Sequence, residues 1–291
     1  MFKNVKNLSP TLQLFFLFGV IVFGFFQYMF VQGIIVLSVF PGIEELSDEE
    51  VMKTVMTSKT GVSQILLILQ QLFFFLLPAL LMNYLLRENG KGIFKWEHNW
   101  KQYFGPIAWM ILGIVSLYFL FYINVHLIDL LPNSEYFIEM DQEREGVIEM
   151  ATSNESVWLF LLNAIAITIL PAIGEEMIFR GFLIRNFYQN SNNIYFAVFG
   201  SSALFALIHF QPLKFIPMFM IGLLLALFYV HTKNLLVPII AHFINNIISL
   251  ISTKYPILEF SENLYFSAGA SLILLIVIVY YVKKLKEKQI L

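Results

Sequence analysis

Long apolar stretches are the feature of this chain that most limits how it can fold. Eight of them can be marked along its 291 residues, and most are near or somewhat below the roughly 20 residues that cross a bilayer as a helix. They cover residues 12–40, 65–86, 106–131, 157–187, 194–209, 215–230, 237–252 and 266–282. We therefore predict an all-α, polytopic membrane helix bundle of about eight transmembrane helices. The fifth to seventh stretches are short, which suggests kinked or partial spans around a polar cavity.

Composition agrees with a membrane protein and excludes several kinds of chemistry. The chain is 58% hydrophobic and 13% charged, whereas a soluble domain has about 45–50% apolar and about 25% charged residues. It has no cysteine, so thiolate catalysis, cysteine-ligated zinc and disulfides are excluded. A net charge of −2 does not favour a nucleic-acid partner. The first apolar run is too long for a signal-peptide core of roughly 7–15 residues, so we expect it to be the first span.

The charges between the stretches predict the topology. With a cytoplasmic N-terminus, thirteen of the eighteen Lys and Arg residues fall in inside segments, which is the positive-inside bias. We therefore expect both termini in the cytoplasm. The outside segments 44–50 and 135–155 are acidic, and we interpret them as charged faces of surface helices rather than metal sites. The inside segment 88–103 combines lysines with aromatic residues, as interfacial anchors do.

Three ionisable side chains lie in the fourth apolar stretch, where charge is expensive. They belong to the sequence Pro171-Ala-Ile-Gly-Glu-Glu-Met-Ile-Phe-Arg-Gly181. Charge at membrane depth is normally kept only where it faces a cavity or a partner. On a helix, Glu176 and Arg180 share a face and can form an ion pair, while Glu175 points about 100° away. Glu175 could then be a general base in a low-dielectric site, or both acids could lie at headgroup level and end the helix.

Two further motifs place histidines in neighbouring stretches. Phe205 and His209 are four residues apart, as are His242 and Asn246. Each pair therefore shares one face of a helix. A single histidine at the end of an apolar run is usually an interfacial residue, and one buried polar pair commonly helps helices to pack. The functional interpretation rests on the three motifs occurring together.

Together, the three motifs resemble those of the CAAX protease and bacteriocin-processing family of intramembrane proteases. The family motifs E-E-x-x-x-R, F-x-x-x-H and H-x-x-x-N stand here as Glu175-Glu176-Met-Ile-Phe-Arg180, Phe205-Ala-Leu-Ile-His209 and His242-Phe-Ile-Asn-Asn246. The resemblance covers residues 157–252, which it implies are the catalytic core. Residues 1–156 would be membrane helices without a recognisable motif, and 253–291 the last membrane helix and a basic cytoplasmic tail.

The resemblance implies an endopeptidase that cleaves a membrane-associated peptide or protein. Glu175, assisted by His209, would activate water, and Glu176 and Arg180 would form a supporting pair. His242 and Asn246 would stabilise the oxyanion or hold a metal that does so. Glu175, His209 and His242 could also ligate a divalent metal such as zinc, and a metal-free glutamate mechanism is equally open. The expected place is the bacterial plasma membrane, with the site facing the cytoplasmic side.

Two alternatives and one difficulty accompany this interpretation. Buried Glu, His and Arg also build proton relays, so a proton-coupled transporter is an alternative, and a non-catalytic membrane binding protein is another. The difficulty is that simple alternation places Glu175 and His209 toward opposite ends of their helices. The site can form only if the fourth helix extends to about residue 187, so that the acids lie near mid-depth, and if the fifth is tilted or starts deeper.

Overall fold

The computed structural model describes residues 2–58, 60–87, 94, 99–152, 156–253, 255 and 263–287. Within these residues every regular element is a helix. The α-helices are α1 (Pro10–Val39), α2 (Asp48–Thr57), α3 (Val62–Gln71), α4 (Leu77–Leu85), α5 (Phe104–Asp129), α6 (Ser134–Thr152), α7 (Val157–Ala164), α8 (Leu170–Glu176), α9 (Ile184–Ser191), α10 (Ile194–Leu207), α11 (Phe215–Thr232), α12 (Leu236–Ser252) and α13 (Leu264–Lys283). Short 3₁₀ segments occur at η1 (Phe2–Asn7), η2 (Ile43–Glu45), η4 (Trp100–Gln102), η7 (Pro212–Lys214) and η9 (Lys284–Glu287).

Each predicted apolar stretch coincides with a helix, to within a few residues at its ends. Six helical segments are long and apolar enough to cross a membrane, whereas α10 and α12, with 14 and 17 residues, are shorter. The all-α membrane bundle is therefore confirmed, and the count of eight spans remains a prediction. The segment 88–103, predicted to be an interfacial anchor, lies mostly outside the described residues.

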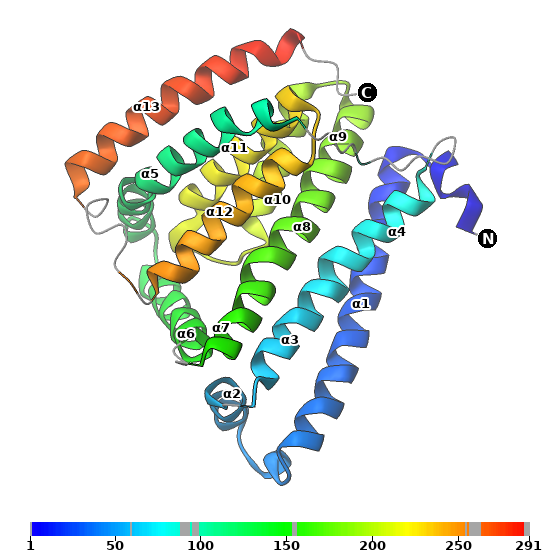
Figure 1. The fold of residues 1–291 in the computed structure, drawn as a ribbon, viewed down its shortest axis with the longest axis vertical. Coiled ribbons are helices and arrows are strands. Elements are labelled where there is room, and N and C mark those ends of the chain that lie inside the picture. Colours follow the sequence, from blue (N-terminus) through cyan, green and yellow to red (C-terminus); the bar gives the residue numbers. More distant parts are fainter. Residues whose placement is uncertain are drawn as a thin grey trace.

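Helix α11 forms the middle of the bundle. Every residue from Ile221 to Val230 is buried, as expected of a helix that is apolar all round. It packs against α5, α10, α12 and α13. In Figure 1, α13 and α5 lie on one side of this centre, while α8, then α3 and α4, and finally α1 lie on the other. The helices that carry the three motifs thus form the inner part of the molecule.

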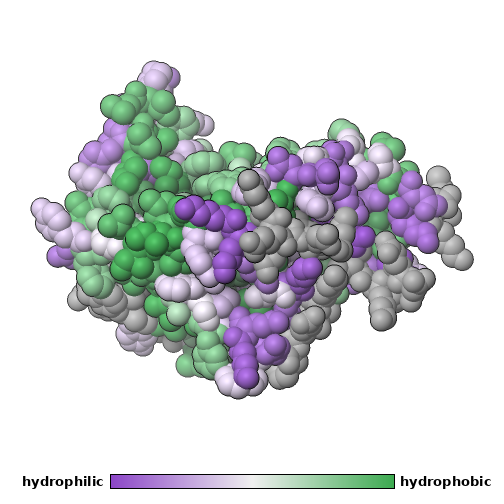
Figure 2. All heavy atoms as spheres, turned by 90° about the horizontal axis from the view of Figure 1, so that it is seen from above, coloured by the Kyte–Doolittle hydropathy of each residue, from purple (hydrophilic) through white to green (hydrophobic). Residues whose placement is uncertain are grey.

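The two ends of the described chain lie at one end of the bundle. The backbone carbonyl of Pro10 accepts a hydrogen bond from Asn186 Nδ2 at 2.7 Å, so α1 begins beside α9. At the other end of the chain, the Tyr281 ring of α13 contacts the His231 ring at the end of α11, with centroids 4.7 Å apart. Figure 2 views this end of the bundle from above, and hydrophilic residues gather over its middle beside a hydrophobic flank. Its assignment to the cytoplasm remains a prediction.

The two acidic segments form α2 and α6 at the opposite end of the bundle (Figure 1). In α2, the prediction of a solvated helical face fits, since the acidic first turn is exposed. There Ser47 and Glu50 form a capping box at the start of the helix. Two hydrogen bonds lower the pKa of Glu50. The larger effect comes from the Ser47 backbone N–H and the smaller from the Ser47 hydroxyl. In α6, Asp141 is only 5% exposed and pairs with Lys214 at 3.9 Å. Part of the charge of α6 is therefore buried, since Asp141 lies on the side of this helix that packs against the bundle.

Gly24 shows how closely α1 approaches the segment that joins α3 to α4. A Cβ atom at Gly24 would lie 2.5 Å from the backbone oxygen of Phe73, which cannot move aside as a side chain could. We expect Gly24→Ala to destabilise the protein by about 1–3 kcal/mol, as overpacking does. Thermal unfolding in detergent measures this loss as a lower melting temperature. Gly19→Ala on the same helix is the matched control, because nothing lies within 4 Å of its added methyl group. Equal melting temperatures for the two variants would contradict the close approach.

Candidate active site

The helix that carries the glutamates runs without a break from Val157 to Ser191, over 35 residues. Glu175 and Glu176 lie near its middle, so the acids do not terminate a helix. This length meets one of the two conditions under which the fourth and fifth stretches could share a site, namely that the fourth helix extends to about residue 187. The helix continues past residue 187, its predicted end, to Ser191. Asn192 then takes the left-handed conformation that closes the helix.

Two segments within this continuous helix are π-helical, η5 (Ile165–Ile169) and η6 (Met177–Leu183). A third, η3 (Leu72–Leu76), lies between α3 and α4. Both η3 and η5 end two residues before a proline, Pro78 and Pro171. Since proline has no N–H to donate and its ring crowds the carbonyl four residues earlier, the ladder widens there. Such π segments often mark functional sites, and here one follows Glu176 directly.

Gly174 lets this helix approach η3 closely. A Cβ atom at Gly174 would lie 2.9 Å from Phe75 Cβ and 3.1 Å from the backbone nitrogen of Leu76. A glycine at position 174 therefore permits this close approach. This contact holds the helix against η3 one residue before Glu175 and Glu176.

Glu176 is fully buried and joins two motifs. Its Oε1 atom accepts a hydrogen bond from Arg180 Nη1 at 2.7 Å, so the predicted ion pair is present. The same oxygen lies 2.9 Å from His242 Nδ1 of α12. Arg180, also fully buried, donates from Nη2 to the backbone oxygen of Gly222 in α11, at 2.9 Å. The Glu176 carboxylate therefore joins α8 to α12, and the Arg180 guanidinium joins η6 to α11.

Phe205 of α10 lies at the centre of these groups. Arg180 Cζ is 4.6 Å from the centroid of the Phe205 ring, a distance at which a cation is attracted to an aromatic face. The rings of His209 and His242 lie 4.8 and 5.7 Å from the same ring. A Cβ atom at Gly222 would lie 3.0 Å from Phe205 Cδ1, so glycine is needed for α11 to come this close. Phe205 thus brings all three motifs together.

Three predicted site residues lie around this core with less contact. Glu175 is 6% exposed, and its Oε2 atom is buried without a hydrogen-bond partner in the described part of the chain. His209 is partly exposed, and its Nδ1 lies 2.6 Å from the backbone oxygen of Phe205. Asn246 is also partly exposed, and its Oδ1 accepts a hydrogen bond from Asn245 Nδ2 at 3.1 Å. Among the described residues, no hydrogen bond joins Glu175 to His209 or His242 to Asn246.

Sequence reasoning missed one position and one contact of the site. Gly222 was not singled out, although a glycine inside a continuous run of large apolar residues signals close helix packing. The direct bond between His242 and Glu176 was also missed, because spacing along one helix says nothing about which neighbouring helix a side chain meets. His242 had been paired with Asn246 on its own helix instead.

The expected metal ligands do not form an assembled set. Both histidines use Nδ1 for a protein oxygen, which leaves Nε2 of each for another group. Such outer bonds do orient metal-ligating histidines. In the described part of the chain, however, no three His, Cys, Asp or Glu side chains gather closely enough to hold a metal ion. As placed, Glu175, His209 and His242 do not fit a metal ion, so we derive no step through one.

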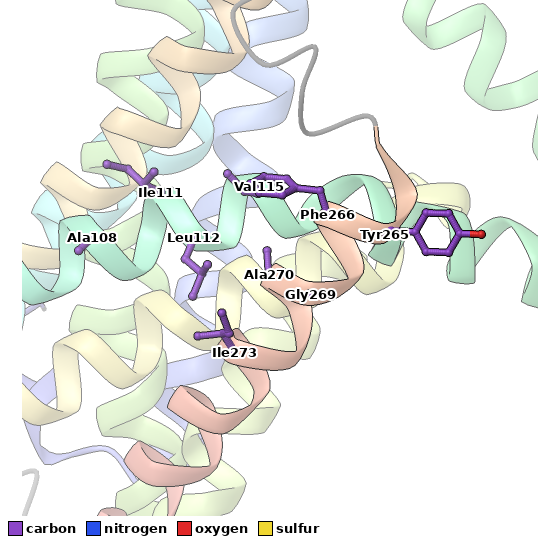
Figure 3. A pocket seen from close by; sticks show the side chains of 9 residues that line it. All are labelled: Ala108, Ile111, Leu112, Val115, Tyr265, Phe266, Gly269, Ala270 and Ile273. Atoms are coloured by element: carbon purple, nitrogen blue, oxygen red, sulfur yellow. The ribbon is translucent and has the colours of Figure 1, made fainter.

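An apolar groove lies elsewhere, between α5 and α13 (Figure 3). It has a volume of about 540 Å³ and is lined by apolar side chains such as Ile111, Leu112, Phe266 and Ile273. None of the candidate site residues lines it. In Figure 3 the Tyr265 hydroxyl points away from the groove, which therefore offers no group for hydrolysis.

Residues 157–248 match the family described as type II CAAX prenyl endopeptidase Rce1-like. The match spans every candidate site residue, so the resemblance drawn from the three motifs is confirmed over this segment. The fold and this match define the class, which is that of integral membrane proteins with a CAAX-protease-like segment.

Two curated proteins of Bacillus subtilis (strain 168) are similar to this chain. One carries the name "Putative membrane peptidase YdiL" and is 27% identical over 158 residues, which cover 54% of this chain and 60% of that protein. The other, "Uncharacterized protein YpbD", is 39% identical over 86 residues, which cover 28% of this chain and 41% of that protein. The chain thus matches about half the length of these relatives. No solved structure matches it.

Proposed function

We propose that this protein is an intramembrane endopeptidase that hydrolyses a peptide bond of a membrane-associated peptide or protein. One observation carries the proposal: a fully buried carboxylate, Glu176, joins Arg180 and His242 beside a second buried carboxylate, Glu175, that has an oxygen without a partner. Keeping two acids and a guanidinium inside an apolar bundle is costly, which favours a functional reason for them. The family match over residues 157–248 supports peptide hydrolysis as that reason.

Glu175 is proposed as the general base. Its unpartnered Oε2 can accept a proton from water, since no described protein group occupies it. His209 would assist. Its Nδ1 faces a carbonyl oxygen, which can only accept a hydrogen bond, so the ring proton lies on Nδ1 and Nε2 is left as an acceptor. A water molecule between Glu175 and His209 Nε2 would then be oriented by both groups.

His242 and Asn246 are proposed to stabilise the oxyanion that forms when hydroxide adds to the peptide carbonyl. Asn246 accepts a hydrogen bond through Oδ1, which leaves its NH₂ group free to donate to this oxygen. His242 uses Nδ1 toward Glu176, so it can donate from Nε2 only when the ring is protonated. The carboxylate of Glu176, which also accepts a hydrogen bond from Arg180, holds the ring in this orientation. The proton taken by Glu175 then passes to the leaving amine.

The same proposal covers the wider organisation of the protein. We place eight spans in a bacterial plasma membrane, with both termini and the site access on the cytoplasmic side. The catalytic core would be residues 157–252, between motif-free helices in 1–156 and a last helix with a basic tail in 253–291. The positive-inside bias supports this orientation.

Cleavage in a defined membrane tests the proposal. The purified protein would be placed in proteoliposomes with a pool of synthetic peptides, each an apolar helix of about 20 residues with a polar tail. We expect mass spectrometry to find new fragments cut at one position, and we expect a metal chelator to leave the rate unchanged. Loss of activity that zinc restores would instead support the metal-dependent version. No cleavage, together with proton-driven flux that requires Glu176 or His242, would overturn the peptidase in favour of a transporter.

A further inference from the structure

His209 lies where the chain leaves its helix. Helix α10 ends at Leu207, and the His209 and Phe210 backbone nitrogens make only tight-turn hydrogen bonds, to Ala206 and Leu207. Phe210 then takes a positive φ of 49°, which turns the chain toward η7. The aim of the His209 ring therefore depends on how the connection from 208 to 215 is held, and not on α10 alone.

Asn124 of α5 holds this connection from inside the bundle. The residue is 3% exposed. Its Nδ2 donates a hydrogen bond to the backbone oxygen of Pro212 at 2.7 Å, and its Oδ1 accepts one from the backbone N–H of Ile216 at 2.8 Å. Pro212 begins η7, and Ile216 lies in the first turn of α11. A single buried amide thus uses a donor and an acceptor together to fix the segment that follows His209.

Lys214, within the same segment, is held from outside the bundle. Its Nζ pairs with Asp141 at 3.9 Å and with Glu145, both in α6. Burial raises the pKa of the Asp141 carboxyl, while the charge of Lys214 lowers it. This pairing is partly exposed and is the weaker of the two attachments, since exposed ion pairs contribute little to stability. The buried Asn124 amide is therefore the main one.

We propose that Asn124 is a positioning residue for catalysis, which aims His209 by clamping the connection between α10 and α11. The inference rests on the proposed role of His209 in orienting water. It assigns a function to α5, which carries none of the three motifs. A leucine at this position can neither donate to Pro212 nor accept from Ile216, so the connection would relax and His209 would lose its fixed direction.

The experiment reads the His209 ring directly and then its contribution to the rate. Full-length protein labelled with ¹⁵N-histidine would be placed in lipid nanodiscs, and His209→Gln would assign its signal among the five histidines. We expect a single Nδ1–H tautomer in the wild type and a mixture of tautomers in Asn124→Leu. In the proteoliposome assay, Asn124→Leu should lower kcat about tenfold or more with KM nearly unchanged, since small misplacements of catalytic groups cost this much. Asn124→Asp, which keeps only the acceptor, should give an intermediate loss.

Ser116→Ala is the matched control. Ser116 is buried on the same helix, but its hydroxyl bonds to Leu112 of that helix and not to the connection. It should leave the tautomer and kcat unchanged. In a His209→Ala background, Asn124→Leu should have no further effect on kcat, because it acts through the missing ring. A tenfold loss that persists in that background, or an unchanged tautomer, would overturn the inference. Normal cleavage by His209→Ala alone would contradict the proposed function instead, while the tautomer still reports on Asn124.

Discussion

Replacing Glu175 by glutamine is expected to abolish peptide cleavage and to leave the melting temperature almost unchanged. Glutamine has nearly the same shape, but it cannot take a proton from water. The general-base contribution is typically about 10²–10⁴-fold in rate. Glu175 makes no hydrogen bond within the described residues through Oε2, so its replacement removes no structural contact there. The measurement is the single-turnover cleavage rate in proteoliposomes beside thermal unfolding of the same preparation.

Glu176→Gln is the informative comparison for this experiment. Glu176 accepts hydrogen bonds from both Arg180 and His242, and its loss leaves the Arg180 charge buried without its partner. We therefore expect this variant to lose stability as well as activity, unlike Glu175→Gln. If Glu175→Gln cleaves at the wild-type rate, or if the two variants behave alike in stability, the division of roles between the glutamates is wrong.

Replacing Arg180 by methionine should cause a large loss of stability. Removing one member of a buried ion pair typically costs about 3–5 kcal/mol, because the other charge stays buried without compensation. Here the loss also breaks the bond to Gly222 and the contact with Phe205. Thermal unfolding in nanodiscs measures the change, and a melting temperature within a degree of the wild type would contradict it.

Two further variants separate the causes of this loss. Arg180→Lys keeps the charge but lacks the planar fork that reaches Glu176 and Gly222 together, so an intermediate stability is expected. Glu176→Gln combined with Arg180→Met removes both charges and should be more stable than Arg180→Met alone. That order of stability would identify the uncompensated carboxylate as the main cost. If the double variant is the less stable of the two, lost packing is the larger cause.

Much of the fold could be predicted because its signals lie along single helices. Long apolar runs set the helices, and the four-residue spacing of Glu176 and Arg180 placed their pair correctly. The contacts between helices could not be predicted in this way. The His242–Glu176 bond depends on how α12 packs against α8, and the Asn124 clamp joins residues about ninety positions apart. The π segments were missed as well, since the prolines that follow two of them do not by themselves specify a π-helical turn.

The short helix α10 has a consequence for the membrane around it. Its 14 residues span about 21 Å, against about 45 Å for the 30 residues of α1 and about 30 Å for the hydrocarbon core. A bilayer that meets a short apolar segment thins locally or lets polar groups reach deeper. Both responses shorten the distance that water must travel to His209 at the end of α10. The short length of α10 would thus bring water deeper into the bilayer on the side of the protein where this helix lies.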